Sequence, residues 1–162
     1  SYMRVIYSKT ARLFEAAAQA SAILSDATEQ QEKALQDYGR YLGTAFQLID
    51  DLLDYDADGS TLGKNTGDDL DEGKPTLPLL HAMKHGNAEQ SALIRQAIEE
   101  GNGRHLLEPV LETMHQAGSL AYTRQRAEEE ADKAIACLSI LPDTPYRRAL
   151  EGLAHLAVKR EY

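Results

Sequence analysis

A long amphipathic segment that ends in three aspartates is the feature that most limits what this chain can fold into. Apolar residues recur every three or four positions between Glu29 and Tyr55, which is the period of an α-helix. Thr28, with Gln31 three residues later, supplies a capping-box start. The sequence therefore predicts a helix from about Glu29 to Tyr55. Its expected apolar face consists of Leu35, Tyr38, Leu42, Ala45, Phe46, Ile49, Leu52 and Leu53.

The opposite face of this predicted helix carries a polar stripe. Its members are Arg40, Gly43, Thr44, Gln47, Asp50, Asp51 and Asp54. Carbonyls at a helix C-terminus carry partial negative charge, so each aspartate there costs roughly 0.3–1 kcal/mol, and a cation would relieve that cost. Because no Lys or Arg lies in the last turn, the pattern favours a bound cation over a plain solvated stripe.

The spacing of the three aspartates suits a metal ion. Asp50 and Asp54 are one helical turn apart and Asp51 borders them, so their carboxylates can converge on one point outside the helix. Mg²⁺ prefers oxygen ligands and is typically held by one or two carboxylates together with substrate phosphates. The sequence therefore predicts a Mg²⁺ site at Asp50, Asp51 and Asp54.

Other side chains are candidate partners of a metal–phosphate site. They are Lys64 and Lys74 in a polar loop from Asp56 to Pro75, Lys9 and Thr10 on a first helix expected from about Tyr2 to Leu24, and Gln47 one turn before Asp50. Loops beyond about 12–15 residues are uncommon unless they have a function. Solubilising charge is the alternative explanation for the loop lysines, and a snorkelling side chain is the ordinary one for Lys9.

A calcium loop is a competing interpretation of the aspartates. Asp54, Asp56, Asp58 and Gly59 match the first half of an EF-hand loop. The twelfth position of such a loop is a bidentate Glu, whereas here it is Asn65, and the sequence contains no second EF-hand pattern. Calcium binding is therefore the less favoured interpretation.

The composition limits the partners and the location. Seventeen Lys and Arg against 26 Asp and Glu give a formal net charge of −9, which argues against nucleic acid and anionic lipid. The single Cys137 rules out a disulfide within one chain and favours a reducing compartment. Without a long apolar run or a basic-then-apolar leader, the sequence predicts no membrane span and a cytoplasmic location. Because helical periodicity begins at once after Ser1 with no cap, we expect a piece of a longer chain.

Helical signals dominate the rest of the chain, and no alternating strand pattern is present, so the expected fold class is all-α. Helix ends are expected at Gly86, Gly101 and Gly118, and helix starts at Asn87, Ser119 and Thr144–Pro145. Residues expected on apolar faces include Leu13 and Phe14 in the first helix and Leu150, Leu153, Ala154 and Ala157 in the last.

Two further groups are expected to have ordinary roles. Glu128–Glu130 is interpreted as the exposed side of a helix. None of the five histidines shows ligand spacing with the cysteine or an H-E-x-x-H pattern, so structural or surface roles are predicted for them.

The segment from Gly43 to Asp54 resembles the second aspartate-rich motif, GxxFQxxDDxxD, of the trans-type polyprenyl diphosphate synthases. The Lys9–Thr10 pair is similar to that family's Lys-Thr pair, Gly63–Lys64 to its loop lysine, and residues 71–79 to its EGKxTLPxL segment. The motifs occur in the family's order. The resemblance covers the whole chain and implies that residues 1–162 form the C-terminal half of a single isoprenoid-synthase-type helical bundle.

The resemblance also implies a function and a set of roles. Such an enzyme condenses isopentenyl diphosphate with an allylic prenyl diphosphate, here to a long-chain product of octaprenyl length for isoprenoid quinone biosynthesis, and acts as a homo-oligomer. Asp50, Asp51 and Asp54 would hold Mg²⁺, and Lys9, Lys64 and Lys74 would neutralise the departing diphosphate. Thr10 and Gln47 would face the allylic substrate and its cation.

One departure from the family pattern leaves an alternative open. The family's first DDxxD motif and its N-terminal Gly-Lys-x-Arg segment are absent from this sequence, and Asp68–Asp71 does not replace them. The chain therefore carries roughly half of an active site. A non-catalytic subunit or assembly module that pairs with a complete partner is the alternative to a catalytic half.

Overall fold

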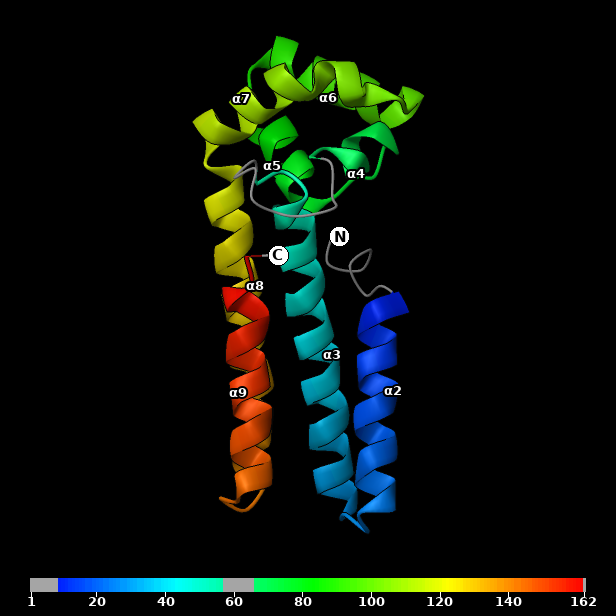
Figure 1. Cartoon of the computed structure of the whole chain (residues 1–162), viewed down its shortest axis with the longest axis vertical. Coiled ribbons are helices and arrows are strands. Elements are labelled where there is room, and N and C mark those ends of the chain that lie inside the picture. Colours follow the sequence, from blue (N-terminus) through cyan, green and yellow to red (C-terminus); the bar gives the residue numbers. More distant parts are fainter. Residues whose placement is uncertain (1–8, 57–65, 162) are drawn as a thin grey trace. The chain divides into compact units, whose positions relative to one another are not determined.

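The computed structural model describes residues 9–56 and 66–161 (Figure 1). All regular elements in these two ranges are helices, which confirms the all-α class. They are α2 (Lys9–Leu24), α3 (Glu29–Leu53), α4 (Asp68–Asp71), α5 (Leu77–His85), α6 (Ala88–Glu100), the 3₁₀ turn η1 (Gly103–Leu106), α7 (Leu107–Ala117), α8 (Ser119–Cys137), the 3₁₀ turn η2 (Leu138–Ile140) and α9 (Pro145–Lys159). None of the helices in the described part is long and apolar enough to cross a membrane.

The helices form two compact units. The first unit comprises residues 1–49 and 125–161, and the second comprises residues 50–124. Helices α3 and α8 each contribute residues to both. The prediction of a single domain for residues 1–162 is not tested by this division and stays a prediction.

In the first unit, α3 begins as the sequence predicts. The Gln31 backbone N–H donates to the Thr28 hydroxyl at 3.1 Å, and the Thr28 N–H donates to the Gln31 side-chain oxygen at 3.0 Å. This reciprocal pair satisfies two of the amide groups that a helix start leaves without partners. The capping box is therefore confirmed.

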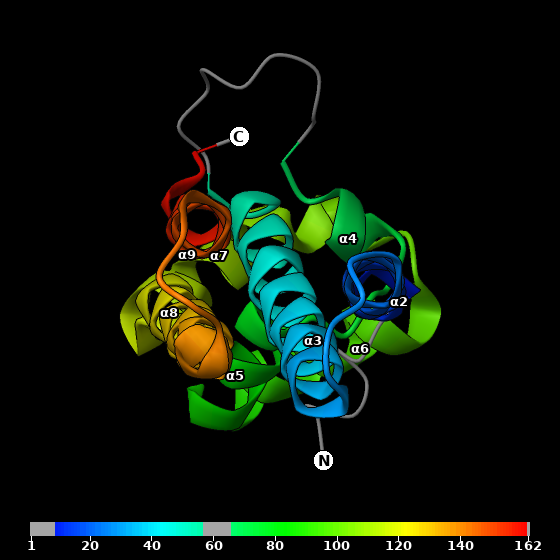
Figure 2. The same ribbon diagram turned by 90° about the horizontal axis from the view of Figure 1, so that it is seen from below.

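Small residues allow α2 and α3 to pack closely side by side (Figures 1 and 2). A Cβ at Gly43 would lie 2.5 Å from the Ala11 Cα, and one at Gly39 would lie 2.5 Å from the Phe14 carbonyl oxygen. Ala11 and Ala22 are fully buried. Gly43 is thus a helix-packing residue, and the prediction that it lies on an unpacked polar face of the helix is wrong.

The predicted apolar faces of the outer helices are wrong at individual residues. On α2, Leu13 is 69% exposed because Ala11 and Ala22 occupy the packed side instead. On α9, Ala154 and Ala157 are buried as predicted, but Leu153 is 51% exposed. Alanines are prominent on the packed side of both helices, joined on α9 by the buried Val158, and they permit a closer approach than leucine would.

The C-terminal helix is attached to α3 by polar contacts within the first unit. The Tyr38 hydroxyl donates to the Leu150 carbonyl at 2.7 Å. The Arg160 guanidinium donates to the Phe46 carbonyl at 2.9 Å and lies 3.7 Å from the centre of the Phe46 ring. At the other end of α9, the Arg147 N–H donates to Thr144, the predicted N-cap, at 3.3 Å.

Glu130 corrects another expectation in the first unit. It is only 3% exposed, whereas the sequence predicted an exposed acidic stretch. Lys133 Nζ lies 3.1 Å from Glu130 Oε1, and Arg126 Nη2 lies 3.6 Å from the same oxygen. The two cations make burial of this carboxylate possible.

The second unit has its own apolar core between α5, α6 and α7. The core consists of Tyr55, Leu70, Leu79, Ala82, Ile94, Ala97, Val110 and Met114. Asn87 starts α6 with a complete capping box to Gln90, and Gly101 and Gly118 end their helices with positive φ angles of 67°. The predicted helix starts and stops are confirmed here, because capping chemistry is local in sequence.

The sequence predicted a continuous loop between α3 and α5, and this prediction is wrong in part. Asp68–Asp71 forms the short helix α4, preceded by Gly67 in the left-handed conformation with φ 88°. Helix α3 ends at Leu53, so Asp54 lies in the turn beyond it. Both corrections concern how the aspartate-rich end of α3 meets the chain that follows.

We expect Gly43→Ala to lower the free energy of unfolding by about 1–3 kcal/mol, because the new methyl group would overlap the Ala11 backbone. Gly152→Ala is the matched control, since a Cβ there has no neighbour within 4 Å. A gain of about 0.5–1 kcal/mol from helix propensity is expected for the control. Urea unfolding of both variants measures the difference, and equal shifts would contradict the α2–α3 contact.

We expect Glu130→Gln to destabilise the chain by about 1–3 kcal/mol, because Arg126 and Lys133 would lose a buried charged partner. Glu128→Gln is the control at an exposed position of the same helix and should change stability by less than about 0.5 kcal/mol. Thermal melts of the two variants provide the comparison. Indistinguishable melting temperatures would show that the buried carboxylate contributes nothing.

Candidate functional site

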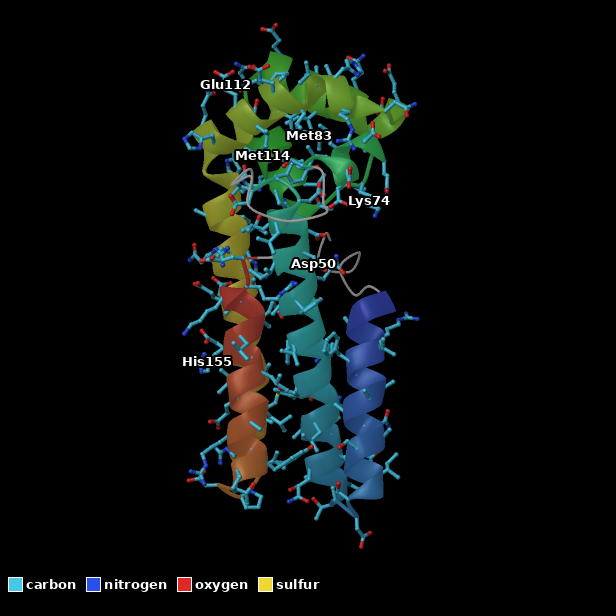
Figure 3. The ribbon with its side chains drawn as sticks, in the orientation of Figure 1. Asp50, Lys74, Met83, Glu112, Met114 and His155 are labelled. Carbon is cyan, nitrogen blue, oxygen red and sulfur yellow. The ribbon has the colours of Figure 1, made fainter. Side chains whose placement is uncertain are left out.

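The three aspartates at the end of α3 differ in their surroundings. Asp51 is 6% exposed and Asp54 is 8% exposed, whereas Asp50 is partly exposed. No basic residue lies in the last turn of α3, as the sequence predicted. Figure 3 marks Asp50 on α3 and Lys74 before α5, both within the second unit.

Asp54 connects the end of α3 to the segment around α4, where the chain returns to α3. Its Oδ2 accepts the Asp69 backbone N–H at 3.0 Å, and its carbonyl oxygen accepts the Gly67 N–H at 2.9 Å. A carboxylate that accepts a backbone N–H makes one of the stronger hydrogen bonds in proteins. Part of the negative charge at the helix end is therefore stabilised by the chain itself.

The predicted convergence of all three carboxylates is not present in the structure. Among residues 9–56 and 66–161, no group of three or more acidic, histidine or cysteine side chains is arranged to hold a metal ion. The donor chemistry nevertheless suits Mg²⁺, because the end of α3 offers carboxylate oxygens alone. The metal-binding role of Asp50, Asp51 and Asp54 stays a prediction.

Lys74 lies close to the hydrogen bond between Asp54 and Asp69, because it contacts Asp69 directly. Its Nζ is 2.9 Å from Glu72 Oε2 and 3.6 Å from Asp69 Oδ1, and its backbone N–H donates to the Asp69 carbonyl at 2.8 Å. The hydrogen bond to Glu72, followed by the charge of Asp69, raises the pKa of Lys74. The ammonium group is therefore positively charged, and because the side chain is more than half exposed it can contact a phosphate group.

Asp69 belongs to the candidate site, although its sequence position predicted no role for it. It donates its N–H to Asp54 and presents its carboxylate to Lys74. Its position in an aspartate pair after a glycine was the available signal, but the return of this segment to α3 was not visible in the sequence.

Two buried hydroxyl groups lie in the same region. Tyr55 is 1% exposed, and Thr76 begins α5 as its N-cap residue, yet its side chain makes no capping bond. The Thr76 hydroxyl faces the Tyr55 phenol, but neither oxygen makes a well-formed hydrogen bond. Burial, followed by the charge of Asp54, raises the pKa of Tyr55, so the phenol stays protonated. Tyr55 belongs to the apolar core of the second unit, and Thr76 is buried two residues after Lys74.

Arg104, in η1, contacts the residues that lead into α4. It donates to the Thr66 carbonyl at 3.2 Å and also pairs with the Asp68 carboxylate. The neighbouring Asn102 N–H donates to the Asp71 carbonyl at 2.7 Å. The turn η1 is thus a second support for the returning chain, which sequence reasoning missed because its partners are some 30 or more positions away.

The structure describes the remaining predicted site residues only in part. Lys9 and Thr10 lie on α2 and Gln47 lies on α3 in the first unit, whereas the aspartates and Lys74 belong to the second. The Lys9 and Thr10 side chains, Lys64 and most of the EF-hand-like segment lie outside the described residues. Whether Lys9 and Asp50 face a common cleft stays a prediction.

The second unit also contains a hollow of about 630 Å³. Its lining residues are Tyr55, Asp56, Leu111, Glu112, His115, Gln116 and Leu120. Neither Asp50 nor Lys74 borders it, so this hollow is not the predicted diphosphate site.

Comparison with known proteins identifies what the chain is similar to. The family model described as polyprenyl synthetase matches residues 1–114. The chain is 76% identical to octaprenyl diphosphate synthase of Escherichia coli and 64% identical to that of Haemophilus influenzae, over 99% and 100% of its length. It covers 50% and 49% of these proteins, so it spans about half the length of the curated relatives it matches.

Solved structures show the same relationship. A decaprenyl diphosphate synthase from Rhodobacter capsulatus matches with a TM-score of 0.88 at 42% identity, over 99% of this chain and 50% of that one. A polyprenyl synthase from Caulobacter crescentus, complexed with calcium and isoprenyl diphosphate, matches with a TM-score of 0.90 at 41% identity, over 99% and 49%. These matches and the family model lead to one conclusion: the chain belongs to the polyprenyl synthetase family.

Proposed function

We propose that the chain is the C-terminal half of a catalytic domain that makes a long-chain, octaprenyl-length diphosphate for isoprenoid quinone biosynthesis. The observation that carries this proposal is the 76% identity to an octaprenyl diphosphate synthase over 99% of the chain. The aspartates, the loop lysines and the Lys-Thr pair also occur together in this sequence.

The proposed reaction requires stabilisation of the negative charge on the departing diphosphate. The allylic C–O bond breaks, and the diphosphate departs with the electron pair. The double bond of isopentenyl diphosphate then attacks the carbocation, and loss of a proton restores an alkene. Electrostatic stabilisation of the leaving group is the main catalytic contribution in such chemistry.

The chain's own residues have distinct parts in this proposal. Asp50, partly exposed, is the main candidate ligand for Mg²⁺, which would neutralise the departing diphosphate when bound. Lys74, held beside Asp69, supplies positive charge to the same diphosphate. Asp54 has a second task, because its carboxylate also fixes the segment that carries Lys74.

Lys9, Thr10, Gln47 and Lys64 complete the proposed substrate site. Lys9 and Lys64 would share the neutralisation of diphosphate, while Thr10 and Gln47 would face the allylic chain and its cation. The chemistry of a lysine, a hydroxyl and a carboxamide supports these roles.

The paired variants Asp50→Asn and Asp54→Ala test the assignment of the aspartates. Without metal, Asp50→Asn should stabilise the fold by roughly 0.3–1 kcal/mol, since it removes repulsion at the helix end. Asp54→Ala should destabilise it by about 1–3 kcal/mol, because the Asp69 N–H loses its acceptor. In the full-length synthase, both should lower prenyl transfer by orders of magnitude.

Asp56→Asn, at an exposed position just beyond the motif, is the control and should leave stability and turnover nearly unchanged. Thermal melts with chelator and prenyl-transfer assays on the full-length protein provide the two measurements. Wild-type turnover in Asp50→Asn would reject the site assignment. Full-length protein that is inactive even without substitutions would favour the alternative, a non-catalytic assembly module.

Self-association is a further expectation under the proposed function. In the first unit, Leu13 and Ile23 on α2 are 69% and 61% exposed, and Leu156 on α9 is 64% exposed. Exposed leucines and isoleucines on a helix favour burial against another copy or against partner helices. Sedimentation equilibrium should therefore show a homo-oligomer that Leu13→Gln or Leu156→Gln weakens, and a monodisperse wild-type monomer at high concentration would refute it.

A further inference from the structure

Two histidines share one face of α5, at a place that the proposed reaction does not use. His81 and His85 are four residues apart, and their ring centres are 4.3 Å apart with an interplanar angle of 38°. His85 is exposed and His81 is partly exposed. Histidines at this helical spacing can bind one ion together, as in H-E-x-x-H metal sites.

A buried serine orients the first ring. His81 Nδ1 lies 2.8 Å from the hydroxyl oxygen of Ser119, which is fully buried at the start of α8. When Nδ1–H donates to this oxygen, Nε2 carries the lone pair and is available as a ligand. Histidines that bind metals usually have such an outer hydrogen bond on the second nitrogen. Tyr122 stacks on the same ring at 4.3 Å and limits its rotation further.

The ring separation is close to what a shared ion requires. With metal–nitrogen distances of about 2.0–2.1 Å, two imidazole centres on one ion lie roughly 4.6–5.3 Å apart for bond angles between 90° and tetrahedral. The observed 4.3 Å falls just short of this range. Because His85 is exposed, a small rotation of its side chain can supply the difference.

The donors define the class of ion. Neutral imidazole suits Zn²⁺, Ni²⁺ and Cu²⁺, whereas Mg²⁺ prefers oxygen. Burial, followed by the charges of His85 and Lys84, lowers the pKa of His81, which favours the neutral ring. Within the described part of the chain no third acidic, histidine or cysteine ligand completes the set, so water would fill the other positions.

We propose that His81 and His85 form a binding site for one divalent transition-metal ion, with Ser119 as the residue that positions His81. Affinity should follow the order expected for nitrogen ligands, with Cu²⁺ bound more tightly than Ni²⁺ or Zn²⁺. The ion would also stabilise the second unit, because it binds the folded helix and not the unfolded chain.

The test uses the chain as it exists, prepared without a histidine tag. Calorimetric titration with Cu²⁺ in about 10 mM Mg²⁺, which occupies carboxylate sites, should show one ion per chain. His85→Gln should weaken binding by about tenfold or more, and Ser119→Ala should weaken it less while the ion still binds. Electron paramagnetic resonance should show nitrogen coupling from two imidazoles in the wild type and from one in His85→Gln.

His155→Gln is the matched control. His155 is exposed on α9, projects away from its helix in Figure 3, and has no histidine one turn away. Its replacement should leave Cu²⁺ affinity unchanged. Equal binding by wild type and His85→Gln, or a greater loss in His155→Gln, would overturn the proposal. Because no prenyl-transfer assay is involved, this outcome is independent of the proposed function.

Discussion

The hydrogen bond between the Asp54 carboxylate and the Asp69 N–H is the interaction on which the candidate site depends. It joins the end of α3 to the start of α4 and thereby returns the chain toward Lys74. A second bond, from the Gly67 N–H to the Asp54 carbonyl, fixes the same turn. An aspartate at this position therefore costs less than its place at a helix C-terminus suggests, because backbone donors satisfy it. The same residue type can then serve both the fold and a cation.

Close packing in the first unit depends on small residues rather than on large apolar ones. Ala11 meets Gly43, so α2 and α3 approach at backbone distance, while Leu13 remains outside the contact. The exposed leucines are consequently available to a partner without any cost to the packing of their own unit. The packing of the first unit also includes a buried charge. Arg126 and Lys133 pair with the Glu130 carboxylate and so allow it to occupy a buried position.

Local features of the fold were predictable, and contacts between distant residues were not. The capping box at Thr28, the helix start at Asn87 and the glycine stops at Gly101 and Gly118 follow from a few neighbouring residues. The short helix α4, the burial of Glu130 and the support that Arg104 gives to Thr66 did not appear in the sequence pattern. Each depends on which segments meet, and helical periodicity does not specify that.

By itself, the sequence determined the all-α class, the long helix that ends in aspartates, and the resemblance that named the candidate residues. These rest on periodicity, capping and motif spacing, all of which act over short stretches of chain. Only the tertiary structure decided that Gly43 packs against Ala11, that Asp54 accepts a hydrogen bond from Asp69, and that Ser119 orients His81. The physical reason is that these contacts join residues between 15 and 38 positions apart, as in Asp54–Asp69 and His81–Ser119, whose proximity is set by packing of whole helices.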